Sequence, residues 1–393
     1  MKHCLDSSRA SGFRALAKTN GFAAALTGAG VLLLLLGIVS PAGAADRQWT
    51  GSASGLWSNP NNWSPAGIPQ DGEDLIFDTN QNESMVNDLT NLRVGSLRLR
   101  EHDYVLSGNT LIILDRIVVP LVHNENSVVT INCRLTLGAD VEIAVAAGSG
   151  LFIQNPNELH LRGPINLNGN DLQLDATGAS QEPGGKILSS KMFVSGPISG
   201  SGNVTASPRH DCSIVFDGSE GNTFSGTLRA ISLSDDSDPA RIRFNKSTGV
   251  VVTDRLEVFG RVVLDRDNQI GDQATVAFGA IANFGPDARD RSFLNFQGHS
   301  DTFANLVFTN RNLIADAAFL DTAGGTLTLL GDIITDTRDV TPILRGRIDL
   351  PAGDHRFDIG GELFYGLSIE AIFVRSAGHW PPVTSVTSLR YFE

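Results

Sequence analysis

Residues 107–114 read Ser107-Gly108-Asn109-Thr110-Leu111-Ile112-Ile113-Leu114, a Gly-Asn bend followed by a short apolar run. Related phrases return at 167–172 (LNGNDL), 222–228 (NTFSGTL) and 325–332 (GTLTLLGD). Glycine and asparagine tolerate positive φ at tight bends, and short apolar runs fill the column inside stacked coils. The recurrence therefore predicts an all-β chain that winds into a right-handed, single-stranded parallel β-helix, a β-solenoid.

The rest of the chain after residue 45 shows the same pattern of residues. Short apolar runs are bounded by Gly, Asn, Asp or Pro, and no long segment shows the periodicity of an amphipathic helix. This pattern excludes α/β folds and leaves a sandwich, barrel, propeller or solenoid, among which the repetition favours the solenoid. Coils of about 22 residues would give about 15 coils. We also expect asparagines at equivalent bends to stack into hydrogen-bonded ladders that satisfy buried backbone groups.

Charge limits the classes of partner. The chain has 43 acidic and 30 basic residues, a formal net charge of −13. Residues 1–44 contribute +3, so the remainder carries −13 − 3 = −16. An acidic surface repels phosphate backbones, which argues against nucleic-acid binding. Such a surface keeps an extracellular protein soluble, and it can also attract divalent cations.

The first 44 residues have the order of a secretory signal peptide. Basic residues precede the apolar stretch 21–39, and the small-residue site Ala42-Gly43-Ala44 follows Pro41. We expect cleavage after Ala44 and a secreted, extracellular or cell-surface location. An uncleaved membrane anchor is the alternative, because an apolar stretch of this length can just span a bilayer.

Three of the four tryptophans, Trp49, Trp57 and Trp63, lie close together in the segment 49–63. We interpret 45–90 as a Trp-rich N-terminal cap, 91–375 as the solenoid and 376–393 as a divergent or truncated tail. The tryptophans can form the packed core of the cap, or they can contact a glycan by stacking against sugar rings. Pro and Asn between them favour a compact fold and hence the packed core.

The segment Trp49-Thr50-Gly51 … Gly55-Leu56-Trp57 … Asn62-Trp63, followed by Pro69, Asp74 and Phe77, resembles the opening of exported bacterial proteins with autotransporter-associated β-strand repeats. Units such as 200–204 with 221–228 are similar to the repeats of that family, and the resemblance touches most of 46–375. It implies a long β-helical passenger at the cell surface. No stretch with the pattern of an outer-membrane translocator is recognised here, so self-translocation is not predicted.

A carbohydrate-active enzyme is the strongest rival, because lyases and hydrolases of polysaccharides often use this fold. Asp235-Asp236 and Asp238, followed by Arg241-Ile242-Arg243, slightly resemble the acidic and basic elements of pectin-type hydrolases. The spacing differs, since Gly298-His299-Ser300 comes after the arginines and not between them. A solvated acidic loop is the simpler interpretation.

Two acidic clusters are candidates for calcium, residues 234–238 and the set Asp332, Asp336 and Asp339. Neither has the spacing of a known calcium loop, and no His or Cys spacing suggests zinc. Cys133 and Cys212 are far apart in the sequence, so they either pair or remain as two buried thiols. We therefore assign no catalytic, cofactor-binding or metal-binding residue.

These observations predict a secreted or cell-surface repeat protein with a structural or adhesin-like, non-catalytic role and no cofactor. Extracellular polysaccharide or other surface proteins are the expected partners, and contact with a membrane is expected only through the export signal. The alternatives are a polysaccharide lyase or hydrolase, or a carbohydrate-binding surface module. The ligand, the oligomeric state and the mode of anchoring do not follow from the sequence.

Overall fold

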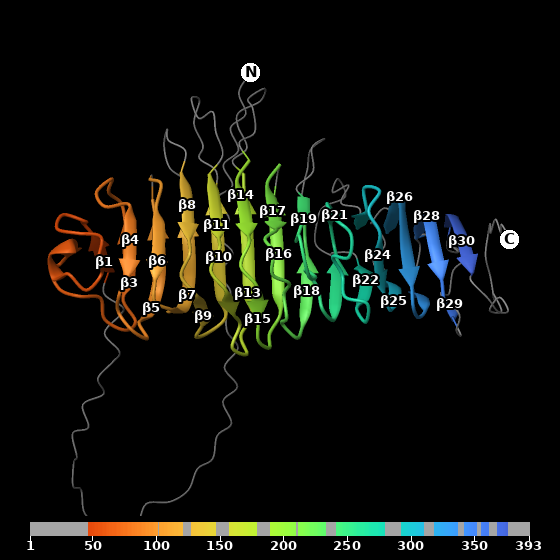
Figure 1. Ribbon diagram of the computed structural model, residues 1–393, viewed down its shortest axis with the longest axis horizontal. Coiled ribbons are helices and arrows are strands. Elements are labelled where there is room, and N and C mark those ends of the chain that lie inside the picture. Colours follow the sequence, from red (N-terminus) through yellow and green to blue (C-terminus); the bar gives the residue numbers. More distant parts are fainter. Residues whose placement is uncertain are drawn as a thin grey trace, which may run out of the picture. The chain divides into compact units, whose positions relative to one another are not determined.

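The computed structural model describes residues 46–100, 102–120, 127–146, 157–178, 189–209, 211–232, 241–279, 292–309, 318–336, 342–351, 355–360 and 368–375. Strands make up 54% of these described residues, which contain no α-helix, only the 3-10 turn η1 (Pro60–Asn62). Most strands run parallel to their neighbours in two long sheets (Figure 1). The all-β, parallel-strand architecture predicted from the repeats is confirmed. The predicted signal peptide and the tail 376–393 lie outside the described residues.

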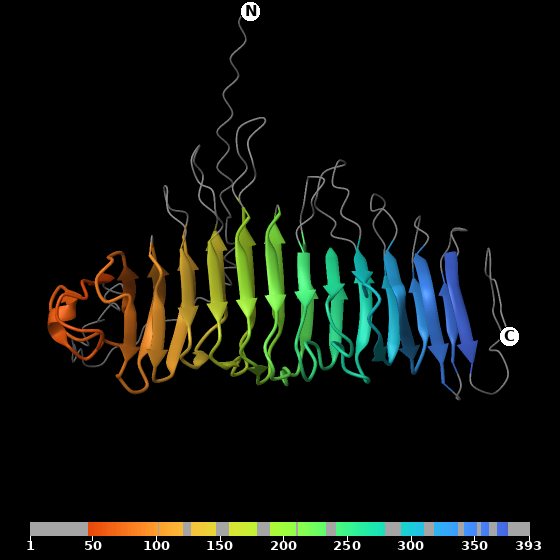
Figure 2. The same ribbon diagram turned by 45° about the horizontal axis from the view of Figure 1, so that its top comes forward.

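Sheet B has 13 strands, all of them parallel to the strands beside them. Apart from β23 and β24, which both pair with β26, consecutive members of the sheet come from consecutive turns of the chain, as Figure 2 shows. In chain order they are β4 (Ser84–Asn87), β6 (Val105–Gly108), β8 (Val128–Ile131), β11 (Glu158–Leu161), β14 (Lys191–Val194), β17 (Ser213–Phe216), β19 (Arg241–Phe244), β21 (Arg261–Leu264), β23 (Phe293–Asn295), β24 (Asp301–Phe303), β26 (Phe319–Leu329), β28 (Ile343–Leu350) and β30 (Ser368–Arg375).

Sheet A has 17 strands, and its one antiparallel pair among the described residues is β1 with β2. Each turn of the chain leaves sheet B, passes through sheet A and returns to sheet B. The members of sheet A are β1 (Asp46–Trp49), β2 (Trp63–Ser64), β3 (Asp74–Phe77), β5 (Arg93–Leu99), β7 (Leu111–Val119), β9 (Leu135–Leu137), β10 (Val141–Ala146), β12 (Ile165–Asn166), β13 (Leu172–Thr177), β15 (Ile198–Ser199), β16 (Val204–Arg209), β18 (Thr227–Ala230), β20 (Arg255–Val258), β22 (Thr275–Gly279), β25 (Asn305–Thr309), β27 (Ile333–Asp336) and β29 (Phe357–Gly360).

The coils are longer and less regular than the sequence predicted. Strand register in sheet B leads from Ser84 to Glu370 in 11 steps, which makes the mean coil about 26 residues long, within the usual range of solenoid repeats. The shortest step leads from Arg243 to Val263, and the longest leads from His160 to Phe193. The expected coil length was therefore too short as an average. The reason is that the strands keep their register while the connections between them vary in length.

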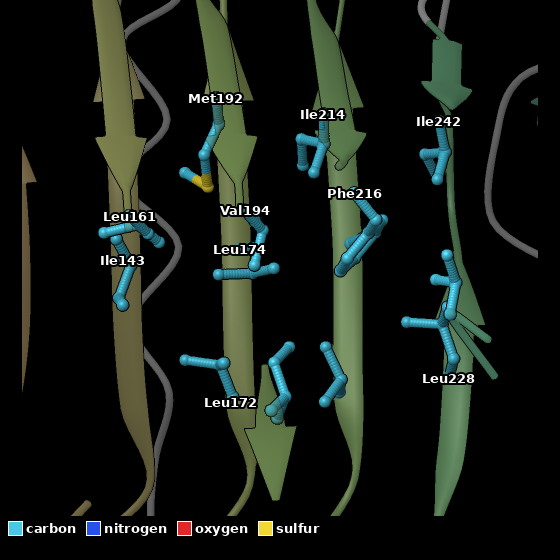
Figure 3. Close-up of a cluster of buried hydrophobic side chains, with 14 of the residues drawn as sticks. Ile143, Leu161, Leu172, Leu174, Met192, Val194, Ile214, Phe216, Leu228 and Ile242 are labelled. Carbon is cyan, nitrogen blue, oxygen red and sulfur yellow. The ribbon is translucent and has the colours of Figure 1, made fainter. Parts of the chain in front are cut away.

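The core is a set of apolar columns between the two sheets. In sheet A, Ile143 lies opposite Leu174, and both are fully buried. In sheet B, Val194 lies opposite Phe216, and these are also fully buried. Figure 3 shows these side chains converging from neighbouring coils. Burial of each such side chain contributes roughly 1.5–3 kcal/mol, and each coil obtains it only by stacking on the next.

Polar bends join the strands as the repeats predicted. Asn168 and Gly169 both take positive φ, 53° and 87°. Asn222, with 2% of its surface exposed, accepts a hydrogen bond from the Ile198 N–H at 3.0 Å and donates to the Val251 carbonyl at 2.9 Å. The buried amide thus satisfies backbone groups of the coils on either side of it, as expected for asparagine at the bends, although its partners are main-chain groups and not a ladder of other asparagines.

Candidate functional site

The three tryptophans form one buried cluster beside the first coils. Trp49, Trp57 and Trp63 are 0%, 0% and 2% exposed. The Trp63 ring lies edge-on to the rings of Trp49 and Trp57, at 4.9 and 5.7 Å between centroids, and Trp57 stacks on Phe77 at 5.6 Å. The Trp63 Nε1–H donates to the Trp57 carbonyl at 2.9 Å.

This packing leaves no open ring face for the glycan contact considered for Trp49, Trp57 and Trp63. Stacking on a sugar needs an open ring face, and here the faces and edges are used against other aromatic rings. The observed packing agrees with the alternative interpretation, in which the three tryptophans form a packed core. Strand β1 pairs antiparallel with β2 and parallel with β3, so the cluster continues into the coils through Phe77.

The pectinase-like elements are only partly described. Asp235, Asp236 and Asp238 lie outside the described residues. Arg243 makes two hydrogen bonds to the Asp265 carboxylate, at 2.7 and 2.8 Å. The His299 Nδ1 lies 3.3 Å from the Asp267 carboxylate. His299 follows β23, which is two strands along sheet B from β19, the strand that holds the two arginines.

The second calcium candidate is not brought together among the described residues. The Asp332 carboxylate accepts the Arg356 N–H at 2.9 Å, so it closes a bend between adjacent coils. Asp339 and the side chain of Asp336 lie outside the described part of the chain. Within that part, no group of three His, Cys, Asp or Glu side chains has the geometry of a metal site.

Cys133 and Cys212 are both free and buried, so the two-thiol alternative is the one observed. Burial raises the pKa of the Cys133 thiol to about 12, and burial also raises the pKa of Cys212. A protonated, enclosed thiol is a poor nucleophile and a poor metal ligand. These cysteines are therefore part of the core.

The outer face of sheet B carries side chains that, apart from Arg241 and Arg243, the sequence did not single out. In β14 and β19 the first and third residues are partly exposed and alternate with fully buried ones, and in β17 and β21 the first residue alone is partly exposed. We call the following set of outward residues in β14, β19, β21, β23 and β26 the cationic–aromatic face: Lys191, Phe193, Arg241, Arg243, Arg261, Phe293 and Phe319.

Rings and guanidinium groups stack along this face from coil to coil. His160 and Phe193 lie parallel, with 4.6 Å between centroids and 6° between planes. Phe293 and Phe319 are 4.9 Å apart, and the Arg261 guanidinium lies 5.4 Å from the Phe293 centroid. These separations match the spacing of adjacent strands, because each ring stands on a neighbouring rung of one sheet.

Positive charge is concentrated on the same face. The six partly exposed positions of β14, β17, β19 and β21 hold four basic and no acidic residues. The Lys191 ammonium lies 3.7 Å from Glu158 in the preceding strand, and the hydrogen bonds of Asp265 raise the pKa of Arg243. In a chain with a net charge of −13, four basic residues on three of four consecutive strands form a distinct electrostatic feature.

The outer face of sheet A carries a different feature, a pair of carboxyl groups. Glu142 and Asp175 lie on the neighbouring strands β10 and β13. Burial, followed by the negative charge of Asp175, raises the pKa of Glu142. Gln173 donates to Asp175 at 2.8 Å, and Arg116 lies 3.9 Å from Glu142. Carboxyl pairs with a raised pKa are suited to acid–base chemistry, so this pair is the best catalytic candidate among the described residues.

Comparison of the chain with protein families, with curated proteins and with solved structures finds no match. Within the described residues there is also no helix with the length and apolarity that a bilayer crossing needs. The functional argument therefore rests on the chain's own surfaces.

Proposed function

We propose that this protein is a secreted or cell-surface β-helical repeat protein with a structural, adhesin-like and non-catalytic role. The observation that carries the proposal is the unbroken parallel stack from β3 to β30, in which each coil buries its apolar face only against its neighbours. A continuous ladder of main-chain hydrogen bonds makes such a stack stiff. Its outer faces repeat side chains at the spacing of one strand, which suits weak contacts made many times.

Two finer features belong to the same proposal. The solenoid is right-handed and single-stranded, as the bends of the repeats and the resemblance to autotransporter-associated repeats suggest. The tryptophan cluster caps its first coil, where β1 pairs with β3 and would otherwise present an open sheet edge. The basic-apolar-small order of residues 1–44 supports export, with removal of the leader after Ala44.

Export and surface location can be tested directly. We expect the exported chain to begin at Ala45 and to be labelled by antibody on intact cells. Deletion of residues 2–44 should retain the protein inside the cell while its circular dichroism remains that of a β protein. Recovery of the intact chain in the cytoplasm, with its leader uncleaved, would contradict the proposal.

The Glu142–Asp175 pair supports a second candidate, a carbohydrate-active enzyme. The test is incubation of the purified chain with uronate and neutral polysaccharides, followed by measurement of new reducing ends and of polymer length. The structural role predicts no change in either quantity. Cleavage that is lost in Glu142→Gln but retained in Glu257→Gln, a carboxylate on β20 of the same sheet, would establish the enzyme instead.

A further inference from the structure

We propose that the cationic–aromatic face of sheet B is a binding surface for an extended acidic polysaccharide, a polymer whose sugars carry carboxylate groups. This inference rests on the proposed surface role and names the polymer that the protein would hold. The site consists of basic and aromatic side chains that come from five coils and are adjacent only because the coils stack.

Strand register brings the charges together. Lys191 lies opposite Ser213, and Ser213 lies opposite Arg241 in the next coil. Ile242 lies opposite Val262, which places Arg241 beside Arg261. These basic residues are far apart in the sequence, yet they stand on nearby rungs in one row.

The aromatic residues continue the row. Arg261 lies opposite Phe293, and Phe293 lies opposite Phe319. The Arg345 guanidinium lies 4.9 Å from the Phe319 centroid, so cations stand over the rings at both ends of this pair. Rings supply flat apolar area for the C–H faces of sugars, and guanidinium groups supply N–H donors that match a carboxylate.

Geometry favours a polysaccharide over other anions. A β-solenoid repeats every ~4.7–4.9 Å, about the advance of one sugar along an extended pyranose chain, so successive sugars can meet equivalent rungs. The row is flat and outward-facing, so a long polymer can lie along it without entering a cavity. Double-stranded DNA also carries closely spaced negative charge. The protein's own net charge of −13 repels a DNA duplex from the surface around this face.

The chain offers a matched control on its other sheet. Arg229 and Arg255 flank Glu257 on the outer face of sheet A, at 3.0 Å each. The double variants Arg241→Gln/Arg261→Gln and Arg229→Gln/Arg255→Gln remove the same charge from opposite faces. The third variant, Phe293→Leu, removes a ring from the row but keeps its charge.

The experiment measures binding of the full exported chain to polygalacturonate, to the same polymer with its carboxyl groups reduced, and to a DNA duplex, each at several salt concentrations. We expect the wild type to bind polygalacturonate selectively and more weakly as salt rises. The Arg241→Gln/Arg261→Gln variant should raise the Kd at least about tenfold and flatten the salt dependence, because it removes charge-assisted hydrogen bonds. Phe293→Leu should raise the Kd with an unchanged salt dependence, and the sheet A control should stay within about twofold of the wild type.

Several results would overturn the proposal: no binding of the wild type at low salt, equal binding of the reduced polymer or of DNA, or equal losses in the two double variants. Circular dichroism of each variant shows whether the fold is retained. Polymer length is measured in the same samples. Shortening of the polymer would refute the non-catalytic role and leave the binding surface standing, whereas loss of selective binding would refute the surface and leave the role standing.

Discussion

Lys246 is a buried lysine whose titration should be visible in the stability of the protein. The residue is 1% exposed, and its Nζ donates to the Asp217 carbonyl at 2.9 Å. Burial lowers the pKa of Lys246 from 10.5 to about 8, against the opposing charges of Asp217 and Glu220. We consider the substitution Lys246→Met, which keeps an unbranched side chain of similar length and removes the titrating group.

The direction in which the free energy of unfolding changes with pH follows from the number of protons that the folded and the unfolded chain bind. Below about pH 8 both the folded and the unfolded chain hold the proton at Lys246. Between about pH 8 and 10.5 the folded chain has released it while the unfolded chain still binds it, so the free energy of unfolding rises with pH. The favourable contribution is complete above pH 10.5 and is lost as the pH falls through about 8. A shift of this size corresponds to about 3 kcal/mol.

The assay is urea unfolding of the wild type and Lys246→Met at intervals from pH 7 to pH 11, followed by far-ultraviolet circular dichroism. Other groups titrate in both proteins, so the difference between the two free energies isolates Lys246. We expect that difference to move by about 3 kcal/mol in favour of the wild type across this range. Carbon-13 labelling of the lysines allows the pKa to be measured directly by NMR. Parallel pH curves, or titration of Lys246 near 10.5, would refute the reasoning.

Four further predictions concern the stack itself. Gly196→Ala should destabilise the protein by several kcal/mol in urea unfolding, because a Cβ at this position would stand 2.1 Å from the Gly163 carbonyl oxygen of the adjacent coil. An unchanged urea midpoint would show that the coils can separate there. Asn222→Leu should cost about 2–4 kcal/mol, since it leaves two buried backbone groups unpaired in the coils on either side. Trp57→Ala should cost about 3–5 kcal/mol, and glycan binding should weaken only in parallel with that loss of stability. The Cys133 thiol should resist alkylation at pH 8 until urea unfolds the chain, and rapid labelling of the native protein would contradict its burial.

The sequence predicted the fold class because the relevant signals are local. Positive φ at Asn168 and Gly169 depends on the conformational freedom of those residues alone, and the structure places both in that region. Alternating apolar residues in β10 predict a strand with one buried side, which is the observed burial pattern. The buried amide of Asn222 follows from the same recurrence at the bends.

The candidate binding site could not be predicted in the same way. The close spacing of the tryptophans left a glycan contact open beside the favoured packed core, and in the structure Trp57 uses its ring face against Phe77. Arg241-Ile242-Arg243 drew attention only as a pectinase-like element, and the structure places both arginines on the outward side of β19. The residues that lie beside these arginines in neighbouring coils could not be predicted from the sequence. The connections differ in length, so the number of residues between equivalent positions changes from one coil to the next.

By itself, then, the sequence determined the strands, the bends and the inward apolar columns, since each depends on residues within a few positions of one another. Only the tertiary structure decided which outward side chains share a surface. Hydrogen-bonded strand register places Lys191, Arg241, Arg261 and Phe293 in one row. This register does not depend on the length of the connection between one strand and the next, so the sequence alone does not reveal it.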